Sequence, residues 1–363
     1  MIIIKRIDKV LLISTCILII FGIIMVYSSS NIWSAYKYND PYKYVKSQFI
    51  FFLIGLIVIY IIQKIKPSYL EKYSNHLLLG CFILLVLVLI PGIGKVRNGS
   101  RSWFGIGPLG IQPSEFSKLG LIIYTSKYLS HNNKNIKDIK KGLIPLFIII
   151  LVFFLLIMLE PDFGTAMVII LTLIVLIYIS GPNLSFFIKI GIIGLIAIVI
   201  LIIIAPYRIK RITAYLNPWS DPLGSGFQII QSLYAIGPSS LLGTGFNNSI
   251  QKNFYLPEPQ TDFIFSIISE EFGIVGVFTI LSLYTIIFYR SIKISLNQNN
   301  LFYKYVTFGL IFGIILQVTL NILVVTGTIP TTGITLPFLS YGGSSLLISM
   351  ISIGIILRIS KEE

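Results

Sequence analysis

Long apolar stretches separated by short polar segments dominate the pattern of this 363-residue chain. Runs of about 18 residues or more recur, and each is long enough to cross a hydrocarbon core as a helix. Many are rich in isoleucine, but an unpaired sheet edge cannot lie in lipid, so the runs predict helices. The expected fold is an all-α polytopic membrane protein in which residues 1–363 form a single domain. The ten predicted spans are 10–28, 47–63, 76–91, 113–130, 143–159, 164–181, 186–206, 261–289, 302–326 and 334–357.

The composition agrees with this class. The chain is 55% hydrophobic and 12% charged, whereas soluble domains carry about 25% charged residues. The first apolar run is longer than a secretory signal and lacks a convincing small-x-small cleavage site, so an uncleaved first span is expected. Cys16 and Cys81 both lie in apolar runs and give neither a disulfide framework nor a metal pattern.

The net charge of +14 would suit nucleic acid or anionic lipid, but the placement of the basic residues favours a topological explanation. With both termini in the cytoplasm, 17 of the 28 Lys and Arg residues fall in inner loops, as the positive-inside rule requires. We therefore expect this orientation and no nucleic-acid partner. The remaining basic residues face outward and suit an anionic ligand that carries phosphate. The alternative for each of them is a solvated loop charge.

The longest connection, about 207–260, joins the seventh and eighth spans and is expected to fold over the outer surface. Loops of this length are usually functional. The sequence FQIIQSLYAI at 227–236 predicts a short interfacial helix within it. The sequence GTGFNNS at 243–249 is a weak candidate for cradling a phosphate through backbone N–H groups.

Acidic residues are concentrated where this loop enters the eighth span, in the sequence YLPEPQTDFIFSIISEEFG. Four of the 14 acidic residues of the chain lie there within fourteen positions: Glu258, Asp262, Glu270 and Glu271. Ionisable groups in a membrane segment are costly and usually mark a reaction site, a pathway or a buried ion pair. A simpler alternative for Asp262 is a capping role, because Thr261 is a good N-cap and a carboxylate suits the first helical turn.

A second outer segment, 95–118, leads into the fourth predicted span. Pro113 suits the first turn of that helix, and Glu115 and Lys118 share one helix face and can neutralise each other. Such a pair can simply allow a polar helix end to enter the membrane. The functional alternative is that Lys118 or Arg101 holds a phosphate while Trp103 lies at the interface.

The turn LEPDFGT joins the fifth and sixth spans and carries Glu160 and Asp162. Asp162 is a candidate N-cap of the following helix. The two histidines, His76 and His131, are both assigned to the inner side, and no Cys/His cluster occurs. A zinc site and an outer histidine base are therefore unavailable, and a carboxylate must be the base of any outer chemistry.

These motifs resemble those of the SEDS proteins (shape, elongation, division and sporulation), the RodA/FtsW/SpoVE group of bacterial cell-wall polymerases. The sequences PEPQTDFIF and FLSYGGSS resemble the motifs of the division and sporulation branch more than those of the elongation branch. The chain departs from the family pattern at Ser239-Ser240 and at Asn247, where glycines are common. The motifs that carry the resemblance are MVYSSS at 25–30, NGSRSWFGIGPLGIQPSEFSK at 98–118, EPDFGTAM at 160–167, NPWSDPLGSGFQIIQSLYAIG at 217–237, YLPEPQTDFIFSIISEEFG at 255–273 and TGITLPFLSYGGSS at 332–345.

The resemblance implies ten transmembrane helices and a glycosyltransferase at the outer face of the bacterial cytoplasmic membrane. Such enzymes polymerise lipid II, the undecaprenyl-diphosphate-linked disaccharide pentapeptide, into β-1,4 glycan strands during division, elongation or sporulation. They work with a class B penicillin-binding protein, a single-span transpeptidase. The catalytic aspartate of the family falls on Asp262. Other family motif positions fall on Arg101, Trp103, Glu115, Lys118 and Asp162.

In the mechanism this predicts, Asp262 takes the proton of the acceptor sugar 4-hydroxyl as that oxygen attacks the anomeric carbon of the lipid-linked donor. The diphosphate leaves with inversion. Glu258 is a neighbour of the base without an assigned role. A divalent cation is a possible cofactor that shares the charge of the diphosphate, although no ligand set for a metal is visible. The candidates to bind the diphosphate are Arg101, Lys118, Arg208, Lys210 and Arg211.

Two other classes of function remain open from the sequence. A transporter that flips a lipid-linked precursor would suit the intramembrane carboxylates and a broken helix around Pro330, Pro337 and Gly342-Gly343. A non-enzymatic scaffold that recruits a division transpeptidase is the other alternative.

Overall fold

The computed structural model describes residues 7–97, 99–106, 109–134, 136–204 and 206–362. Ten of its helices overlap the ten predicted spans. They are α1 (Lys9–Tyr38), α2 (Lys43–Lys64), α3 (Ser68–Leu89), α4 (Pro113–His131), α5 (Ile144–Leu159), α6 (Phe163–Ile179), α7 (Leu184–Ile204), α10 (Ile264–Asn297), α11 (Leu301–Val325) and α12 (Gly343–Ile359). Within the described residues, seven helical segments are long and apolar enough to cross a membrane. The polytopic helical class is thus confirmed, and the number of ten spans stays a prediction.

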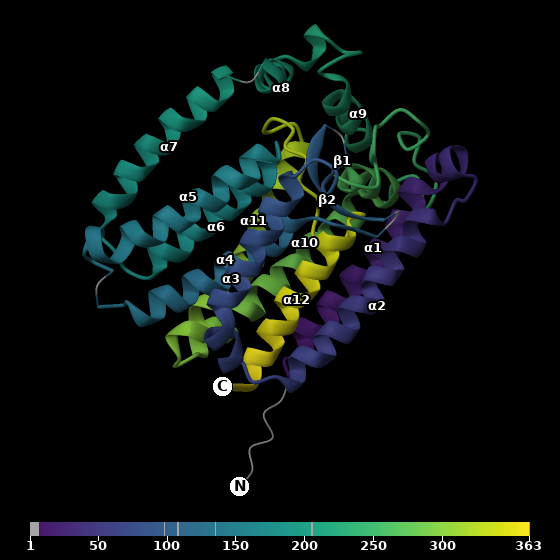
Figure 1. Cartoon of the computed structure of the whole chain (residues 1–363). Coiled ribbons are helices and arrows are strands. Elements are labelled where there is room, and N and C mark those ends of the chain that lie inside the picture. Colours follow the sequence, from purple (N-terminus) through teal and green to yellow (C-terminus); the bar gives the residue numbers. More distant parts are fainter. Residues whose placement is uncertain (1–6, 98, 107–108, 135, 205, 363) are drawn as a thin grey trace.

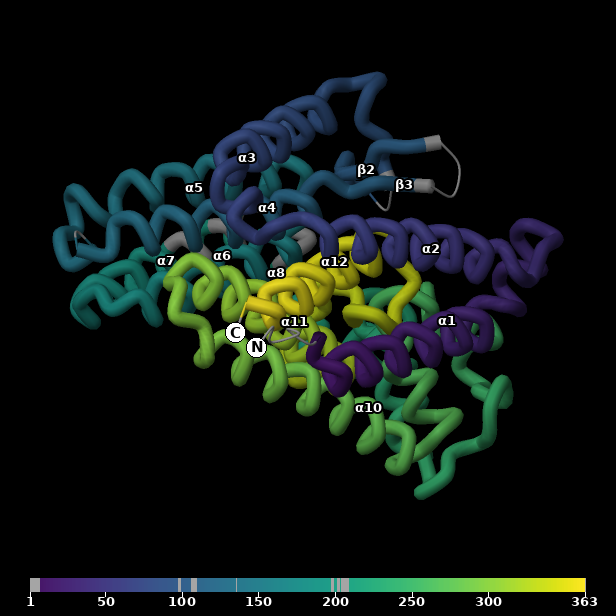
Figure 2. The backbone as a smooth tube through the Cα atoms, turned by 90° about the horizontal axis from the view of Figure 1, so that it is seen from below, coloured from purple at the N-terminus to yellow at the C-terminus, as the bar shows by residue number. Residues whose placement is uncertain are grey.

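The helices run side by side in a bundle. Both termini lie at one end of it, and the strands, α8 (Pro206–Leu216) and α9 (Phe227–Ile236) gather at the opposite end (Figure 1). The helix α12 is almost entirely buried and packs against α2, α4 and α11, and the view from below shows it at the centre of the bundle (Figure 2). The helix α9 occupies the residues predicted for the short interfacial helix.

A three-stranded antiparallel sheet, which the sequence did not predict, lies between α3 and α4. Its strands are β1 (Lys95–Arg97), β2 (Ser100–Ile106) and β3 (Leu109–Ile111), in the order β1-β2-β3. Val96 lies opposite Arg101, and Phe104 lies opposite Ile111. The strands are so short that their alternation of side chains gives little signal in the sequence.

The last predicted span, 334–357, starts too early. The helix α12 begins only at Gly343, and the chain before it is non-helical. Proline cannot donate a backbone hydrogen bond inside a helix, and at Pro337 and Phe338 the chain turns, with Phe338 at a φ of 67°. An irregular segment with buried apolar side chains, such as Phe338, therefore enters the bundle where a continuous helix was expected.

The helix α10 is also interrupted. Gly273 has a φ of 61° and a ψ of −158°, so two helical parts meet at a kink there. A conformation with positive φ is open to glycine because it lacks a Cβ atom. The carboxylates of Glu270 and Glu271 therefore lie at the end of a short first part, and not along one straight span as the sequence suggested.

Candidate active site

Four helices begin close together: α4, α6, α10 and α12. Gln112, just before α4, donates through Nε2 to Oδ2 of Asp162 (2.8 Å), which precedes α6. The backbone N–H of Gln112 donates to Oγ of Ser344 in the first turn of α12 (3.0 Å). The hydroxyl of Ser340, before α12, donates to the carbonyl of Thr261, before α10 (2.6 Å). These bonds join the starts of the four helices.

A polar pocket of about 50 Å³ lies at the starts of α4 and α6, with further walls from α11 and from residues 333–335. Inside it, Nζ of Lys118 donates to Oε2 of Glu115 (2.7 Å) and to Oε1 of Gln317 (2.7 Å). Both charged side chains are buried, so the predicted Glu115–Lys118 pairing is confirmed. The residues that line the pocket are Gln112, Glu115, Lys118, Asp162, Thr165, Val168, Gln317, Gly333, Ile334 and Thr335.

Asp162 is fixed in place by its neighbours. Its Oδ1 accepts from the backbone N–H of Thr165 (3.1 Å), which confirms the predicted N-cap, and its Oδ2 also accepts from the hydroxyl of Ser114 (3.2 Å). Burial raises the pKa of Asp162 above its usual value. Burial and the neighbouring Asp162 raise the pKa of Glu160, before α6, to about 9. Asp162 is thus an anchored carboxyl that holds the pocket together.

Asp262 lies in the turn before α10 and is half-buried. Of the side chains that the structure describes, none donates a hydrogen bond to its carboxylate. Its backbone carbonyl accepts from Nδ2 of Asn321 on α11 (2.8 Å), and the same amide donates to the carbonyl of Ile334 (2.7 Å). A methyl group at Gly333 would lie 3.7 Å from Oδ2 of Asp262. Gly333 therefore lies close to this carboxylate and also lines the pocket.

The capping alternative for Asp262 is wrong. The N-cap of α10 is Phe263, which makes no side-chain capping bond. The hydroxyl of Thr261, the expected cap, donates instead to the carbonyl of Glu258 (2.9 Å). The hydrogen bond from Thr261 to Glu258 closes the turn at 258–262. The carboxylate of Asp262 accepts no hydrogen bond from the first N–H groups of α10.

The surroundings of Asp262 raise its pKa to about 7. The main cause is burial, which disfavours the charged form. The nearby carboxylates of Glu258 and Asp162 raise the pKa further, and the guanidinium of Arg211 lowers it. Asp262 is therefore a carboxyl group that gains and loses a proton near neutral pH.

The basic residues of α8 differ in their placement. Nη1 of Arg211 donates to the carbonyl of Thr331 (2.8 Å), close to Gly333, and its charge acts on Asp262. Lys210 is exposed and lies near Asp221, whose pKa is held low by hydrogen bonds from Ser225 and by this lysine. The side chain of Arg208 lies outside the described part of the structure.

Arg101 and Trp103 lie on β2 and do not line the pocket. Nη1 of Arg101 is 3.4 Å from the carbonyl of Leu89 at the end of α3, to which it donates. The structure therefore brings together Asp262, Asp162, Glu115, Lys118, Arg211 and Glu258, and it places Arg101, Trp103 and Lys210 apart from them.

Sequence reasoning missed the amide side chains around the site. Gln112 bridges two helix starts, and Gln317 and Asn321 connect α11 to Lys118 and to the turn of Asp262. The signal was present: Gln317 and Asn321 are four residues apart in an otherwise apolar run, so they share one helix face. Polar side chains in membrane helices usually hydrogen-bond to neighbouring helices.

The phosphate cradle considered for GTGFNNS stays a prediction, and several of its backbone donors are already used within the protein. The N–H groups of Thr244 and Gly245 donate to the backbone carbonyls of Glu270 and Glu271 (2.9 Å each). The N–H of Ser249 donates to Oε1 of Glu271 (3.3 Å). These three N–H groups donate to residues of α10, so they are not available to a diphosphate.

No group of three or more His, Cys, Asp and Glu residues within the described ranges is arranged to hold a metal ion. Asp262, Asp162 and Glu258 influence one another through their charge without forming such a group. The divalent cation therefore stays a prediction.

The buried pair of Glu115 and Lys118 gives a prediction about stability. Lys118→Met should lower the apparent melting temperature of the purified protein markedly, because leaving a buried charge unpaired costs about 3–5 kcal/mol. The exposed pair of Lys46 and Asp40 provides the control, and Lys46→Met should leave the melting temperature close to that of the wild type, because exposed ion pairs contribute little to stability. The double variant Lys118→Met with Glu115→Gln should recover part of the loss. Equal melting temperatures for the two lysine variants would contradict this account.

The fold and the site define a class: a polytopic helical membrane protein with a titratable carboxylate and a buried lysine where helices begin at one end of its bundle. The chain belongs to the family that comprises FtsW, RodA and SpoVE, described as Cell cycle protein, whose pattern matches residues 8–363. The resemblance inferred from the motifs is therefore confirmed.

Two curated relatives cover almost the whole chain. Stage V sporulation protein E of Bacillus subtilis is 51% identical over 354 residues, which is 98% of this chain and 97% of that protein. A protein of Saccharophagus degradans named Probable peptidoglycan glycosyltransferase FtsW is 39% identical over 361 residues, covering 99% of this chain and 93% of that one. Both belong to the division and sporulation branch that the motifs favoured.

Two solved structures share the fold. A chain from work on the structural coordination of polymerization and crosslinking by a peptidoglycan synthase complex is 29% identical, with a TM-score of 0.79 and 98% of each chain covered. The rod shape determining protein RodA of Thermus thermophilus is 25% identical, with a TM-score of 0.71, covering 98% of this chain and 97% of that one.

Proposed function

We propose that this chain is a peptidoglycan glycosyltransferase that polymerises lipid II into β-1,4 glycan strands at the outer face of the bacterial cytoplasmic membrane. The observation that carries the proposal is Asp262: a half-buried carboxylate with a pKa of about 7, beside a polar pocket and under the influence of Arg211. The relatives named as probable peptidoglycan glycosyltransferases support it.

In the proposed reaction Asp262 is the general base. It accepts the proton of the 4-hydroxyl of the acceptor sugar while that oxygen forms a bond to the anomeric carbon of the donor. The bond from this carbon to the diphosphate oxygen breaks, and the electron pair leaves with undecaprenyl diphosphate. A base whose pKa lies near the working pH combines a large ionised fraction with a useful proton affinity.

The cations of the site stabilise the leaving diphosphate in this proposal. The effect of the charge of Arg211 on Asp262 supports this role for Arg211. Lys118 acts on the diphosphate mainly through the electrostatic field of its positive charge, because its ammonium group already donates hydrogen bonds to Glu115 and Gln317. Arg101, Trp103, Arg208 and Lys210 would contact more distant parts of the lipid-linked chains. Glu258 would tune the proton affinity of Asp262 by its charge.

We also propose that both termini are cytoplasmic and that a class B penicillin-binding protein is the partner. The two termini lie at the same end of the bundle, and α8, α9 and the strands lie at the other (Figure 1). The basic inner loops fix the orientation in this proposal. The similarity to a chain of a peptidoglycan synthase complex supports a partner that crosslinks the strands.

The test is a polymerisation assay with purified full-length protein in liposomes that contain lipid II. We expect glycan polymer on a gel. Transfer of lipid II between leaflets without polymer would instead indicate a flippase. The absence of both activities, in a protein that still binds a penicillin-binding protein, would indicate a scaffold.

The raised pKa of Asp262 predicts the pH dependence of the reaction. The base is active only when ionised, so the rate should rise with pH through about 7 and level off above it. At pH 6, one unit below this pKa, about one tenth of the molecules carry the ionised base, so the rate should be about tenfold below the plateau. Initial rates measured between about pH 5.5 and 8.5 test this. A rate that is constant over that range would contradict the assignment.

A further inference from the structure

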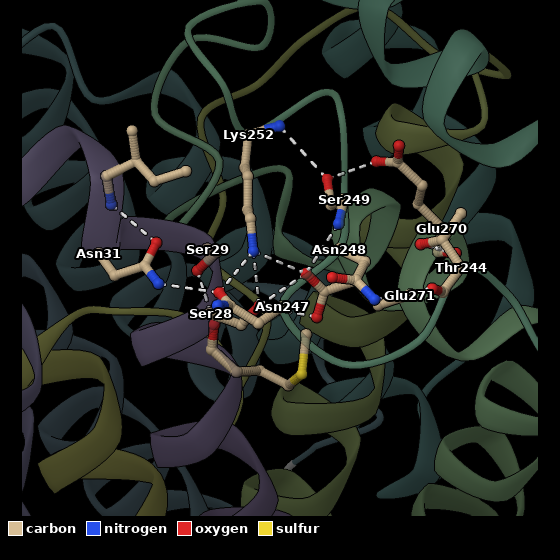
Figure 3. Close-up of polar contacts among 12 residues, drawn as sticks. Ser28, Ser29, Asn31, Thr244, Asn247, Asn248, Ser249, Lys252, Glu270 and Glu271 are labelled. Atoms are coloured by element: carbon tan, nitrogen blue, oxygen red, sulfur yellow. Dashed lines mark hydrogen bonds and ion pairs between the residues drawn. The ribbon is translucent and has the colours of Figure 1, made fainter.

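A buried polar network lies apart from the pocket, where the outer loop meets α1 and α10 (Figure 3). Nζ of Lys252 is 3.1 Å from Oε1 of Glu271, and the side chains are only 2% and 0% exposed. The hydroxyl of Ser28 on α1 donates to the same carboxylate oxygen (2.6 Å). Oδ1 of Asn247 accepts from Lys252 (2.7 Å) and from Nδ2 of Asn31 (2.8 Å). The network thus ties α1, the outer loop and α10 together.

The adjacent Glu270 holds the same stretch of the loop from another side. Its carboxylate accepts from the backbone N–H of Ile250 (2.8 Å), from that of Gln251 (3.4 Å) and from the hydroxyl of Ser249. Consecutive helical residues point about 100° apart. Two neighbouring glutamates therefore hold residues 247–252 between them.

The kink at Gly273 completes this junction. The backbone N–H groups of Ile274 and Val275, freed by the kink, donate to the carbonyls of Ser240 (3.2 Å) and Leu241 (3.1 Å). Loop residues thus take the place of helical hydrogen-bond partners, which the backbone groups of a membrane helix require. The loop is built into α10 and does not merely lie on it.

The ion pair closes a segment that contains the base. Asp262 lies ten residues after Lys252 and nine residues before Glu271. From Ile264 to Glu271 every residue of α10 is buried, so this part transmits the position of Glu271 to the turn of Asp262. The other side of the turn is held by Asn321. The orientation of the carboxylate thus depends on supports at both ends of the segment.

We propose that Lys252 and Glu271 are positioning residues for catalysis, whose ion pair sets the placement of Asp262. The inference rests on the proposed function, because it takes Asp262 to be the base. A buried charge that loses its partner draws in water or moves toward it. Loss of either charge would therefore loosen the junction and shift the turn that ends at Asp262. Misplacement of a reacting group by about 1 Å can cost on the order of 100-fold in rate.

The test compares Glu271→Gln and Lys252→Met with the wild type in the lipid II polymerisation assay, normalised to folded protein. We expect kcat to fall by about 10- to 100-fold, with KM for lipid II changed less than twofold. The pH at which the rate is half-maximal should also move away from about 7, because the surroundings of Asp262 change. A purely structural role would lower the amount of folded protein without moving this pH.

The matched control is Arg290→Gln. Arg290 pairs with Asp8 and so joins α10 to the start of α1, far along the chain from Asp262. The substitution Arg290→Gln should leave kcat and the pH profile unchanged. Where Glu271→Gln does not fold, the exchange variant Lys252→Glu with Glu271→Lys restores the pair and should polymerise better than either of its single changes.

Wild-type kcat and pH profile in folded Glu271→Gln would overturn the positioning role. So would an exchange variant that folds but is no more active than its single changes. The proposed function fails by a different result, the absence of glycan polymer from the wild type, and the assignment of Asp262 as the base fails if Asp262→Asn polymerises normally. An inactive Asp262→Asn together with a normal Glu271→Gln would refute the positioning role alone.

Discussion

Replacing Asp262 with asparagine should lower the rate of lipid II polymerisation by about 10²–10⁴-fold. The amide has nearly the same shape as the carboxyl group but cannot accept the proton of the attacking hydroxyl. No described side chain donates to this carboxylate, so the change breaks no hydrogen bond that holds the fold. The melting temperature should therefore stay close to that of the wild type. The measurement is the initial rate of glycan formation on a gel at about pH 8, where the wild-type base is ionised.

Glu258→Gln is the matched control, because Glu258 is an exposed carboxylate four residues before Asp262 whose charge raises the pKa of the base. It should retain activity within about tenfold and move the rising limb of the pH profile to lower pH. Retention of more than a tenth of wild-type activity by Asp262→Asn would rule out Asp262 as the base. Equal losses in both variants would show that the two carboxylates act together.

Replacing Gly273 with alanine should prevent normal folding. Its φ is 61°, and an added Cβ would lie 2.2 Å from the carbonyl oxygen of Ser240 and 2.5 Å from the backbone nitrogen of Gly243. Backbone atoms cannot yield as a flexible side chain can, so the kink or the loop built into it must open. Strain at a special backbone conformation combined with a clash of this kind costs on the order of 4 kcal/mol or more. The yield of monodisperse protein after size exclusion, and its melting temperature, measure this.

Gly80→Ala in α3 is the control for Gly273→Ala. Nothing lies within 4 Å of the position that its Cβ would take. Alanine is favoured over glycine in a helix by up to about 1 kcal/mol, so this variant should be at least as stable as the wild type. A Gly273→Ala protein with wild-type yield and melting temperature would show that α10 can straighten, which would contradict the junction described.

The sequence predicted the helices of the bundle well, because each long apolar run carries its own signal. Pro113 correctly indicated the start of α4, and the sequence of the turn before α6 correctly predicted that Asp162 caps that helix. The breaks inside the apolar runs at Gly273 and before Gly343 were harder to locate. Both depend on partners from other parts of the chain, which the local pattern does not contain.

The same distinction holds for the site. The pairing of Glu115 and Lys118 followed from their spacing of three residues on one helix. The bond between Ser28 and Glu271 joins residues 243 positions apart, and no local spacing indicates it. Asn247, a departure from the family pattern, proved to be one of the acceptors for Lys252. The assignment of Asp262 as the base came from the motif, and its selection over Asp162 gains support from the hydrogen bonds that only Asp162 accepts.

The four helix starts that hydrogen bonds join near the pocket contribute to the electrostatic potential there. Each helix N-terminus behaves like about half a positive charge, and α4, α6, α10 and α12 all begin there. Together their peptide dipoles contribute about two positive charges. This share of the potential belongs to the backbone, so it neither titrates nor disappears when a lysine or arginine is substituted. Part of the attraction for an anion would therefore persist at alkaline pH and in charge-neutralised variants.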